Sequence, residues 1–221
     1  MLAKELISDV IPALKTSDTG VKALYWMDIF RISHLPIVNN TEFLGLISDT
    51  DIYDMNSPDE AIGNHSLSLF SPYIQEEQHV YEAIELISKL KLSVVPVLDQ
   101  NKNYIGMITA QRLMQFMGDL FAVKNPGGII VLEINANDYS LTQIAQIVES
   151  NDAKILSMYI TSPQDSTKMD LTLKINRIDL TSIIQTFVRF DYMVKAQFME
   201  DDEMENLYSN RYEQFMLYLN I

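Results

Sequence analysis

Two short polar segments carry the residues whose types and spacing could do chemistry. Ser48 and Asp51 stand three positions apart, directly after an apolar stretch that begins with glycine, and Thr109 and Arg112 have the same spacing and context. A carboxylate can accept hydrogen bonds from both adjacent hydroxyls of a ribose, and a hydroxyl and exposed amides at the start of a helix can bind phosphate. The first segment therefore favours binding of a nucleotide.

A second interpretation of these residues needs no ligand. A serine followed three positions later by an aspartate at a helix start is also a capping arrangement that satisfies backbone amides locally. In the second segment Arg112 replaces the acid, and an arginine cannot accept a hydrogen bond and opposes the helix dipole in the first turn. We therefore expect the second ribose site to be lost, with Arg112 either contacting a phosphate of a ligand in the first site or forming a surface salt bridge.

The elements that must position these segments occur twice in the chain. Residues 16–38 align without a gap with residues 76–98, and one extra loop residue then brings Gly45 onto Gly106. Each copy has apolar residues at helical spacing, a short apolar strand, a polar turn, a second strand and the start of a helix. A proline inside each first strand predicts an edge or strand-start position, because proline has no amide to donate to the ladder. Among the aligned pairs are Ser33 with Ser93 and Pro36 with Pro96.

The segment Gly45-Leu-Ile-Ser-Asp-Thr-Asp-Ile52 resembles the closing signature of a CBS domain, and residues 34–38 resemble its central strand. The duplicated order is similar to a Bateman module over residues 1–122, with repeat one at about 1–58 and repeat two at about 66–122. Such pairs commonly bind adenosine-containing ligands in the cleft between the copies and often form disc-shaped dimers. The resemblance thus implies a homodimer, with ribose held at Asp51 and adenine bordered by backbone around residues 34–36.

The ligands implied by this resemblance are AMP, ADP, ATP and S-adenosylmethionine, and no cofactor is required. We expect Thr16 to lie near the ribose and phosphate together with Ser48 and Asp51. The full set of expected nucleotide-binding residues is Thr16, His34, Leu35, Pro36, Ser48, Asp51, Thr109 and Arg112. His34 also has a structural interpretation, as a hydrogen-bonded histidine beside a buried strand.

The second half of the chain predicts a different unit, of the order strand, helix, strand, strand, helix, strand. It follows a cluster of breaking residues at 125–128, and Ser140 and Gln143 form a capping box for its first helix, whereas Asp179 is a candidate cap for its second. This βαββαβ order is that of a ferredoxin-like fold. Residues 126–199 therefore resemble an ACT-type regulatory domain, although the turn at 135–139 lacks the glycine common in ACT effector sites.

The whole chain is accordingly expected to have an α+β fold, a tandem CBS repeat followed by the ACT-type domain. The combined architecture is similar to that of acetoin-utilisation accessory proteins. Residues 200–221, which open with five acids in six positions, predict an acidic C-terminal helical tail with an apolar side.

Composition excludes several classes of function. The chain has 16 basic and 30 acidic side chains, a net charge of −14, which disfavours binding to nucleic acid and to anionic membranes. It has no cysteine, its three histidines are scattered, and it lacks the spacing of a metal site or of a hydrolase motif. Charged residues near Met1 and the lack of a long apolar run predict a soluble, cytoplasmic protein.

Two functional hypotheses follow from these patterns. The first is a non-catalytic regulatory sensor that binds an adenine nucleotide or adenosyl ligand in the CBS cleft. The alternative is a degenerate-site scaffold or dimerisation module without a small-molecule ligand, which the arginine at position 112 favours. An enzyme is the weakest of the readings, because no catalytic constellation is found in the sequence.

Overall fold

The computed structural model of the chain describes residues 1–8, 10–65, 70–162 and 167–199. Contacts divide the chain into two units, Met1–Phe116 and Met117–Ile221, and their cores are formed by different sets of buried residues. The acidic tail predicted at 200–221 lies outside the described residues.

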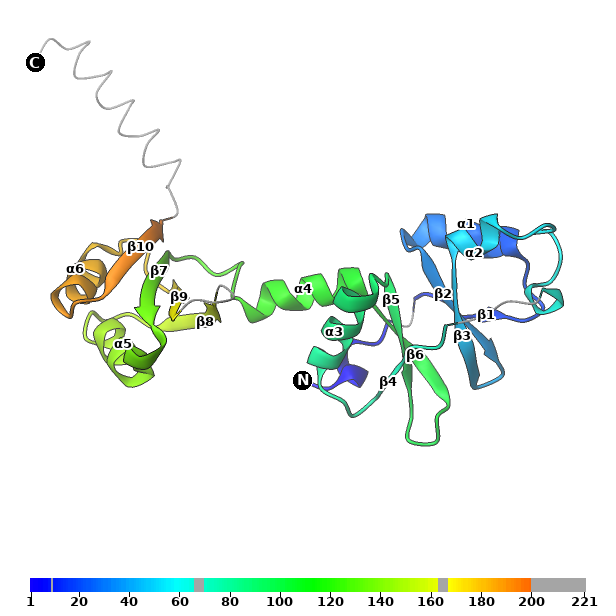
Figure 1. Ribbon diagram of the computed structural model, residues 1–221, viewed down its shortest axis with the longest axis horizontal. Coiled ribbons are helices and arrows are strands. Elements are labelled where there is room, and N and C mark those ends of the chain that lie inside the picture. The colour runs from blue at the N-terminus through cyan, green and yellow to red at the C-terminus, as the bar shows by residue number, and fades with distance from the viewer. Residues whose placement is uncertain (9, 66–69, 163–166, 200–221) are drawn as a thin grey trace, which may run out of the picture. The chain divides into compact units, whose positions relative to one another are not determined.

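The first unit contains the same series of elements twice (Figure 1). The elements of the first copy are β1 (Leu14–Lys15), α1 (Gly20–Phe30), β2 (His34–Asn39), β3 (Glu42–Ser48) and α2 (Asp49–Tyr53). Those of the second copy are β4 (Ile74–Gln75), α3 (Val80–Leu90), β5 (Val94–Leu98), β6 (Tyr104–Thr109) and α4 (Ala110–Leu120). The predicted helix–strand–strand–helix order is confirmed in both copies, and the two-residue strands that open each copy were missed because they are too short to show a period.

Each copy builds a three-stranded sheet, in the orders β1-β2-β3 and β4-β5-β6. The edge position predicted from Pro36 and Pro96 was wrong, since β2 and β5 are the central strands. The prolines are tolerated because the opening strands are so short: β1 pairs only with Ile37 and Val38, and β4 pairs only with the equivalent residues of β5. At each proline, the side that would face the opening strand therefore needs no amide donor.

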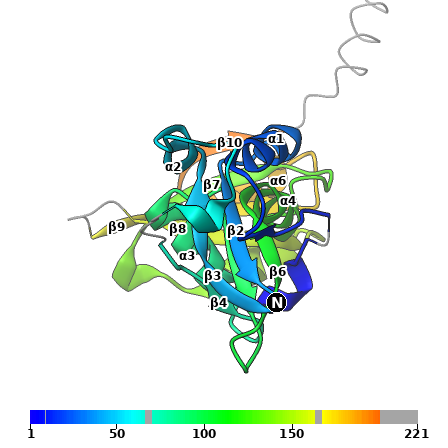
Figure 2. The same cartoon turned by 90° about the vertical axis from the view of Figure 1, so that its right-hand side faces the viewer.

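The helices of the two copies begin and end in matching ways. Ala23 and Met27 of α1 are buried against the first sheet, as their spacing predicts. The residue after α1, Arg31, and the one after α3, Lys91, both have left-handed backbone conformations, with φ of 55° and 54°. A Cβ on Gly20 would stand only 2.9 Å from Ile52 Cγ2, so this glycine lets α1 lie close beside α2. Figure 2 shows both helices on the same side of β2 and β3.

A duplicated glycine shapes the hairpin of each copy. Gly45 has a φ of +154° and Gly106 a φ of +150°, and each pairs with the residue of the neighbouring strand at which the register shifts by a bulge. This backbone region is open to glycine and strained for other residues. The aligned glycines therefore mark one backbone device that is used twice.

The second unit is a four-stranded antiparallel sheet of order β10-β7-β9-β8 with two helices. Its elements are β7 (Ile129–Asn135), α5 (Leu141–Glu149), β8 (Ile155–Thr161), β9 (Lys168–Ile175), α6 (Thr181–Arg189) and β10 (Met193–Phe198), which is the expected βαββαβ order. Alternate residues of β7 and β9 are buried with apolar residues of both helices, which places α5 and α6 on one face of the sheet.

The two helix caps predicted in this unit are present in modified form. The hydroxyl of Ser140 accepts a hydrogen bond from the Gln143 amide at 3.4 Å, but Gln143 Oε1 accepts from the Tyr192 hydroxyl at 2.8 Å rather than closing the box. Asp179 Oδ1 accepts from the Thr181 amide at 2.9 Å, although Leu180 occupies the cap position itself. Among the helices that the structure describes, none combines the length and apolar character needed to cross a bilayer.

Candidate functional site

Ser48 and Asp51 are joined by a closed capping box where β3 ends and α2 begins. The Asp51 amide donates to Ser48 Oγ at 3.1 Å, and Asp51 Oδ2 accepts from the Ser48 amide at 2.8 Å and from the Ser48 hydroxyl at 2.6 Å. The local interpretation of this motif is therefore confirmed. The sequence folds this way because a short acid at the third helical position can reach back to the cap residue.

The two oxygens of the Asp51 carboxylate have different environments. Oδ2 holds the cap, whereas Oδ1 has no hydrogen-bond partner within the described part of the chain, and the residue is exposed. The first amides of α2 are occupied: that of Asp49 donates to Ser33 O at 3.0 Å and that of Thr50 to Asp49 Oδ1 at 2.8 Å. The site thus offers a carboxylate oxygen and the hydroxyls of Ser48 and Thr50, rather than the exposed amides that we expected.

The second motif repeats the cap without the acid. Thr109 is buried, and its hydroxyl accepts from the Arg112 amide at 3.0 Å. The Arg112 side chain is exposed and reaches only Gln115 Oε1, at 3.5 Å. It forms no ion pair with any described residue, so the salt bridge considered above is not found in this part of the chain.

His34 lies where the two repeats touch. The hydroxyl of Ser93 accepts from the amides of Ser33 and His34, each at 3.0 Å. His34 Nδ1 lies 3.0 Å from Ser33 Oγ and 3.1 Å from Ser93 Oγ. Burial lowers the pKa of His34, and the nearby carboxylates of Asp49 and Asp51 oppose that shift. The ring is thus a hydrogen-bonded part of the junction, as the structural interpretation expected, and it also senses the charge of the first motif.

A second junction brings another pair of equivalent residues together. The rings of Phe43 and Tyr104, which align at an offset of 61, stack with centroids 6.5 Å apart, and the Tyr104 amide donates to Thr41 O at 2.7 Å. Burial raises the pKa of the Tyr104 hydroxyl. Part of the seam between the repeats is therefore filled by the protein's own side chains.

The remaining expected residues have different degrees of access. Leu35 and Pro36 are buried within β2, so only their backbone can border a ligand. Thr16 is half-buried in the turn after β1, where its carbonyl accepts from the Gly63 amide at 2.8 Å. Across β2 and β3, His34 pairs with Ser48, which brings the junction and the first motif together. Within the described ranges, no hydrogen bond or ion pair links Thr109 or Arg112 to that group.

The sequence reasoning missed Ser93 and Tyr104 as parts of this region. The alignment of Ser33 with Ser93 was visible, and its meaning is geometric: equivalent residues of two related copies meet where the approximate symmetry axis between them passes. Ala110 repeats the same backbone contact, with its amide donating to Ser93 O at 2.9 Å. Duplicated polar residues in otherwise apolar strands are the signal that could have found this junction.

In the second unit, a surface cavity of about 380 Å³ lies beside the turn Ala136–Asp138. Its rim carries both signs of charge, from Glu133, Asp138 and Lys168, and burial raises the pKa of the Tyr192 hydroxyl at its edge. Neither unit, in the residues that the structure describes, has three histidine or acidic side chains grouped so that they could hold a metal ion.

Comparison with known proteins places the first unit in a family. The model of the CBS domain family matches residues 3–56 and 71–119. The uncharacterized protein MK0525 of Methanopyrus kandleri is 30% identical over 113 residues, which is 48% of this chain and 57% of that relative, so the chain spans little more than half of the relative's length.

Solved structures of similar fold include a CBS domain pair/ACT domain protein of Thermotoga maritima, 19% identical, with a TM-score of 0.48 over 54% of this chain and 98% of that chain. Another is CBSX2 in complex with AMP, 16% identical, with a TM-score of 0.46 over 53% of this chain and 96% of that chain. The duplicated elements and the two family matches agree in their boundaries. Residues 3–56 and 71–119 are therefore two CBS domains, and the first unit of this chain is a tandem CBS pair.

Proposed function

We propose that this chain is a non-catalytic sensor that binds an adenosine-containing small molecule at the first CBS motif. The observation that carries the proposal is the divided Asp51 carboxylate: one oxygen holds the cap, and the other is exposed and can accept from a ribose hydroxyl. Because the cap fixes the side chain beforehand, little rotamer freedom remains to be lost on binding.

The roles of the neighbouring residues follow from their access. Backbone around His34, Leu35 and Pro36 borders the adenine, since the last two side chains are buried. The hydroxyls of Thr16 and Ser48 serve the ribose or phosphate. Thr109 contributes only a cap to the second copy, whereas the exposed guanidinium of Arg112 is available for a phosphate of AMP, ADP or ATP.

The response to the ligand is proposed to pass through the junction at Ser33, His34 and Ser93. A ligand beside this junction can favour one packing of the repeats over another only if it binds the two packings with different affinity. Helix α4 begins at the second motif and continues to Leu120, so a change in the pair can be passed along the chain to the second unit.

Isothermal titration with AMP, ADP, ATP and S-adenosylmethionine tests the proposal. We expect heat from at least one ligand, and a loss of affinity of about tenfold or more in Asp51→Asn, because a hydrogen bond to a charged group contributes about 1.5–3 kcal/mol. Asp49→Asn is the matched control, since it removes the same charge from the same helix and should change affinity far less. Absence of heat with the wild type at high ligand concentration would remove the proposal.

The scaffold alternative is favoured by one specific observation: the capping box is closed without a ligand, and the second copy has no acid to bind ribose. A thermal-shift series separates the two functions. A ligand at a hundred times its dissociation constant stabilises its sensor by about 2.7 kcal/mol, whereas a scaffold gains nothing from any nucleotide.

For residues 126–199 we propose a ferredoxin-like, ACT-type regulatory domain, supported by the βαββαβ order and the sheet order β10-β7-β9-β8. A CBS pair followed by such a domain is also the order of acetoin-utilisation accessory proteins. The acidic composition supports a cytoplasmic role with small molecules and protein partners rather than nucleic acid.

A further inference from the structure

Helix α1 presents an apolar stripe to its outer side. Val21, Tyr25 and Ile29 stand four positions apart and are 48%, 64% and 51% exposed. Residues at this spacing lie in one row along a helix. The stripe is separate from the buried face of α1, where Ala23 and Met27 pack on the sheet.

The second repeat supplies an internal comparison. Helix α3 has the same alternation of buried and exposed positions as α1, so both helices dock on their sheets in the same way. At the three positions equivalent to the stripe, α3 carries Tyr81, Glu85 and Lys89. The fold of a repeat therefore does not require apolar residues there, and the stripe on α1 needs another explanation.

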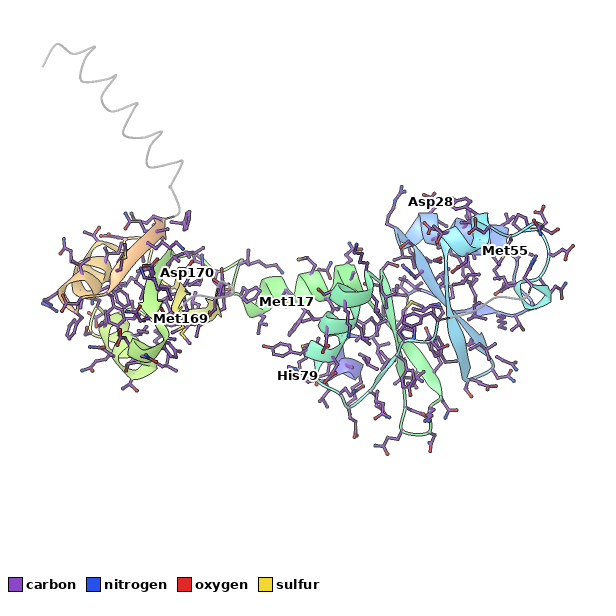
Figure 3. All side chains as sticks on the ribbon, viewed as in Figure 1. Asp28, Met55, His79, Met117, Met169 and Asp170 are labelled. Atoms are coloured by element: carbon purple, nitrogen blue, oxygen red, sulfur yellow. The ribbon has the colours of Figure 1, made fainter. Side chains whose placement is uncertain are left out.

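Charges flank the stripe in an order that suits a reversed copy of the same helix. At one end Lys22 Nζ pairs with Asp18 Oδ1 at 2.6 Å, and at the other Arg31 Nη1 pairs with Asp28 Oδ1 at 2.8 Å. Figure 3 shows Asp28 on the side of α1 that faces away from β2 and β3. Two α1 helices packed antiparallel about Tyr25 place position 22 opposite position 28, because each lies three positions from the centre. Every base then faces an acid of the other copy.

We propose that a second copy of this chain docks on α1, helix against helix and antiparallel, with the two Tyr25 side chains at the centre. Val21 of each copy then packs against Ile29 of the other, and Lys22 faces Asp28. Such an interface is isologous, as expected for a two-fold dimer. An aromatic centre with a charged rim is also the composition that protein interfaces favour.

The same geometry argues against α3 as the docking helix. A reversed copy centred on Glu85 would bring two like charges together, which is destabilising. The proposed dimer thus joins the first repeats of the two chains and leaves α3 outside the contact. This inference does not depend on ligand binding.

Sedimentation velocity of the full chain over a range of concentrations tests the interface by charge exchange. We expect the wild type to dimerise, Asp28→Lys to raise the dissociation constant about tenfold because two lysines then face each other, and the double variant Lys22→Asp/Asp28→Lys to regain the wild-type value. Ser88→Lys, at the equivalent position of α3, should leave dimerisation unchanged. Circular dichroism of each variant checks that these exposed substitutions preserve the fold.

A second measurement uses the absence of native cysteine. Tyr25→Cys should form a covalent dimer with a short bis-maleimide, whereas Glu85→Cys should remain a monomer under the same conditions. A monomeric wild type, a dimer unaffected by Asp28→Lys, or a double variant that fails to recover would each overturn the proposed surface.

Discussion

At the residue scale, one carboxylate can serve both folding and binding because its two oxygens have different neighbours. Asp51 Oδ2 stabilises the start of α2, and Oδ1 faces outward. In the second repeat, Arg112 keeps its amide bonded to Thr109 while its side chain has the opposite charge. The duplicated cap thus preserves the helix start in both copies, and the chemistry available to a ligand differs between them.

His34 makes stability depend on pH in a defined direction. Burial holds the pKa of His34 below its ordinary value of 6.5, so the unfolded chain binds a proton more readily than the folded chain as pH falls through that value. We expect the contribution of neutral His34 to be complete above pH 6.5 and to be lost progressively below it. Protonation also removes Nδ1 as an acceptor at the junction with Ser93.

Urea unfolding of the wild type and of His34→Gln, above and below pH 6.5, measures this effect. The difference in unfolding free energy between the two proteins should shift in favour of the variant on acidification, and the contributions of His65 and His79 cancel in that difference. A pH-independent difference would contradict the assigned environment of His34.

At the element scale, the two copies show that a backbone device, rather than residue identity, is what the repeat preserves. Gly45 and Gly106 occupy the same positive-φ position beside a bulge, and Arg31 and Lys91 end their helices in the same left-handed conformation. These devices turn the chain at matching points, so two different sequences give the same order of strands and helices.

Two glycine substitutions should therefore have opposite effects. Gly106→Ala should cost about 1–3 kcal/mol, because its backbone conformation is strained for alanine and the new Cβ would collide with Ile7. Gly118→Ala should add about 0.5–1 kcal/mol, since it lies within α4 and a Cβ there meets no described atom within 4 Å. Chemical denaturation of both variants measures the contrast, and equal shifts would contradict the assignment of Gly106 to a strained position.

At the scale of the whole molecule, each unit has its own buried core. Phe187 is fully buried in the second unit, with both helices of that unit and three of its strands around it. Leu35 is fully buried in the first repeat, where Trp26 packs against the same core. Because the cores share no residues, a cavity made in one should destabilise that unit first.

The single tryptophan of the chain, Trp26, allows this to be followed. We expect Phe187→Ala to lower the stability of the second unit by about 3–5 kcal/mol and to leave the unfolding transition seen by Trp26 fluorescence in place. Leu35→Ala should shift the fluorescence transition instead. Circular dichroism reports both units, and a common shift in both probes for both variants would show that the units unfold as one.

Much of the fold could be predicted from local patterns. The aligned apolar positions, such as Ala23 with Ala83, predicted the helices because burial of one helix face needs a regular spacing. The glycines at 45 and 106 marked the hairpins, and the Ser48–Asp51 spacing predicted a cap that is present. These features depend on residues close together in the chain, whose interaction is set by backbone geometry alone.

The candidate site depended more on tertiary structure. Sequence could not show that β2 is a central strand despite Pro36, because that follows from how few residues β1 pairs with. It also could not bring Ser93 to His34, or Tyr104 to Phe43, since these contacts join positions about 60 residues apart. By itself the sequence determined the duplicated elements and their caps; only the packing of the two copies decided which polar groups are occupied by the protein and which remain exposed to a ligand, because burial and hydrogen bonding between distant segments are properties of the assembled chain.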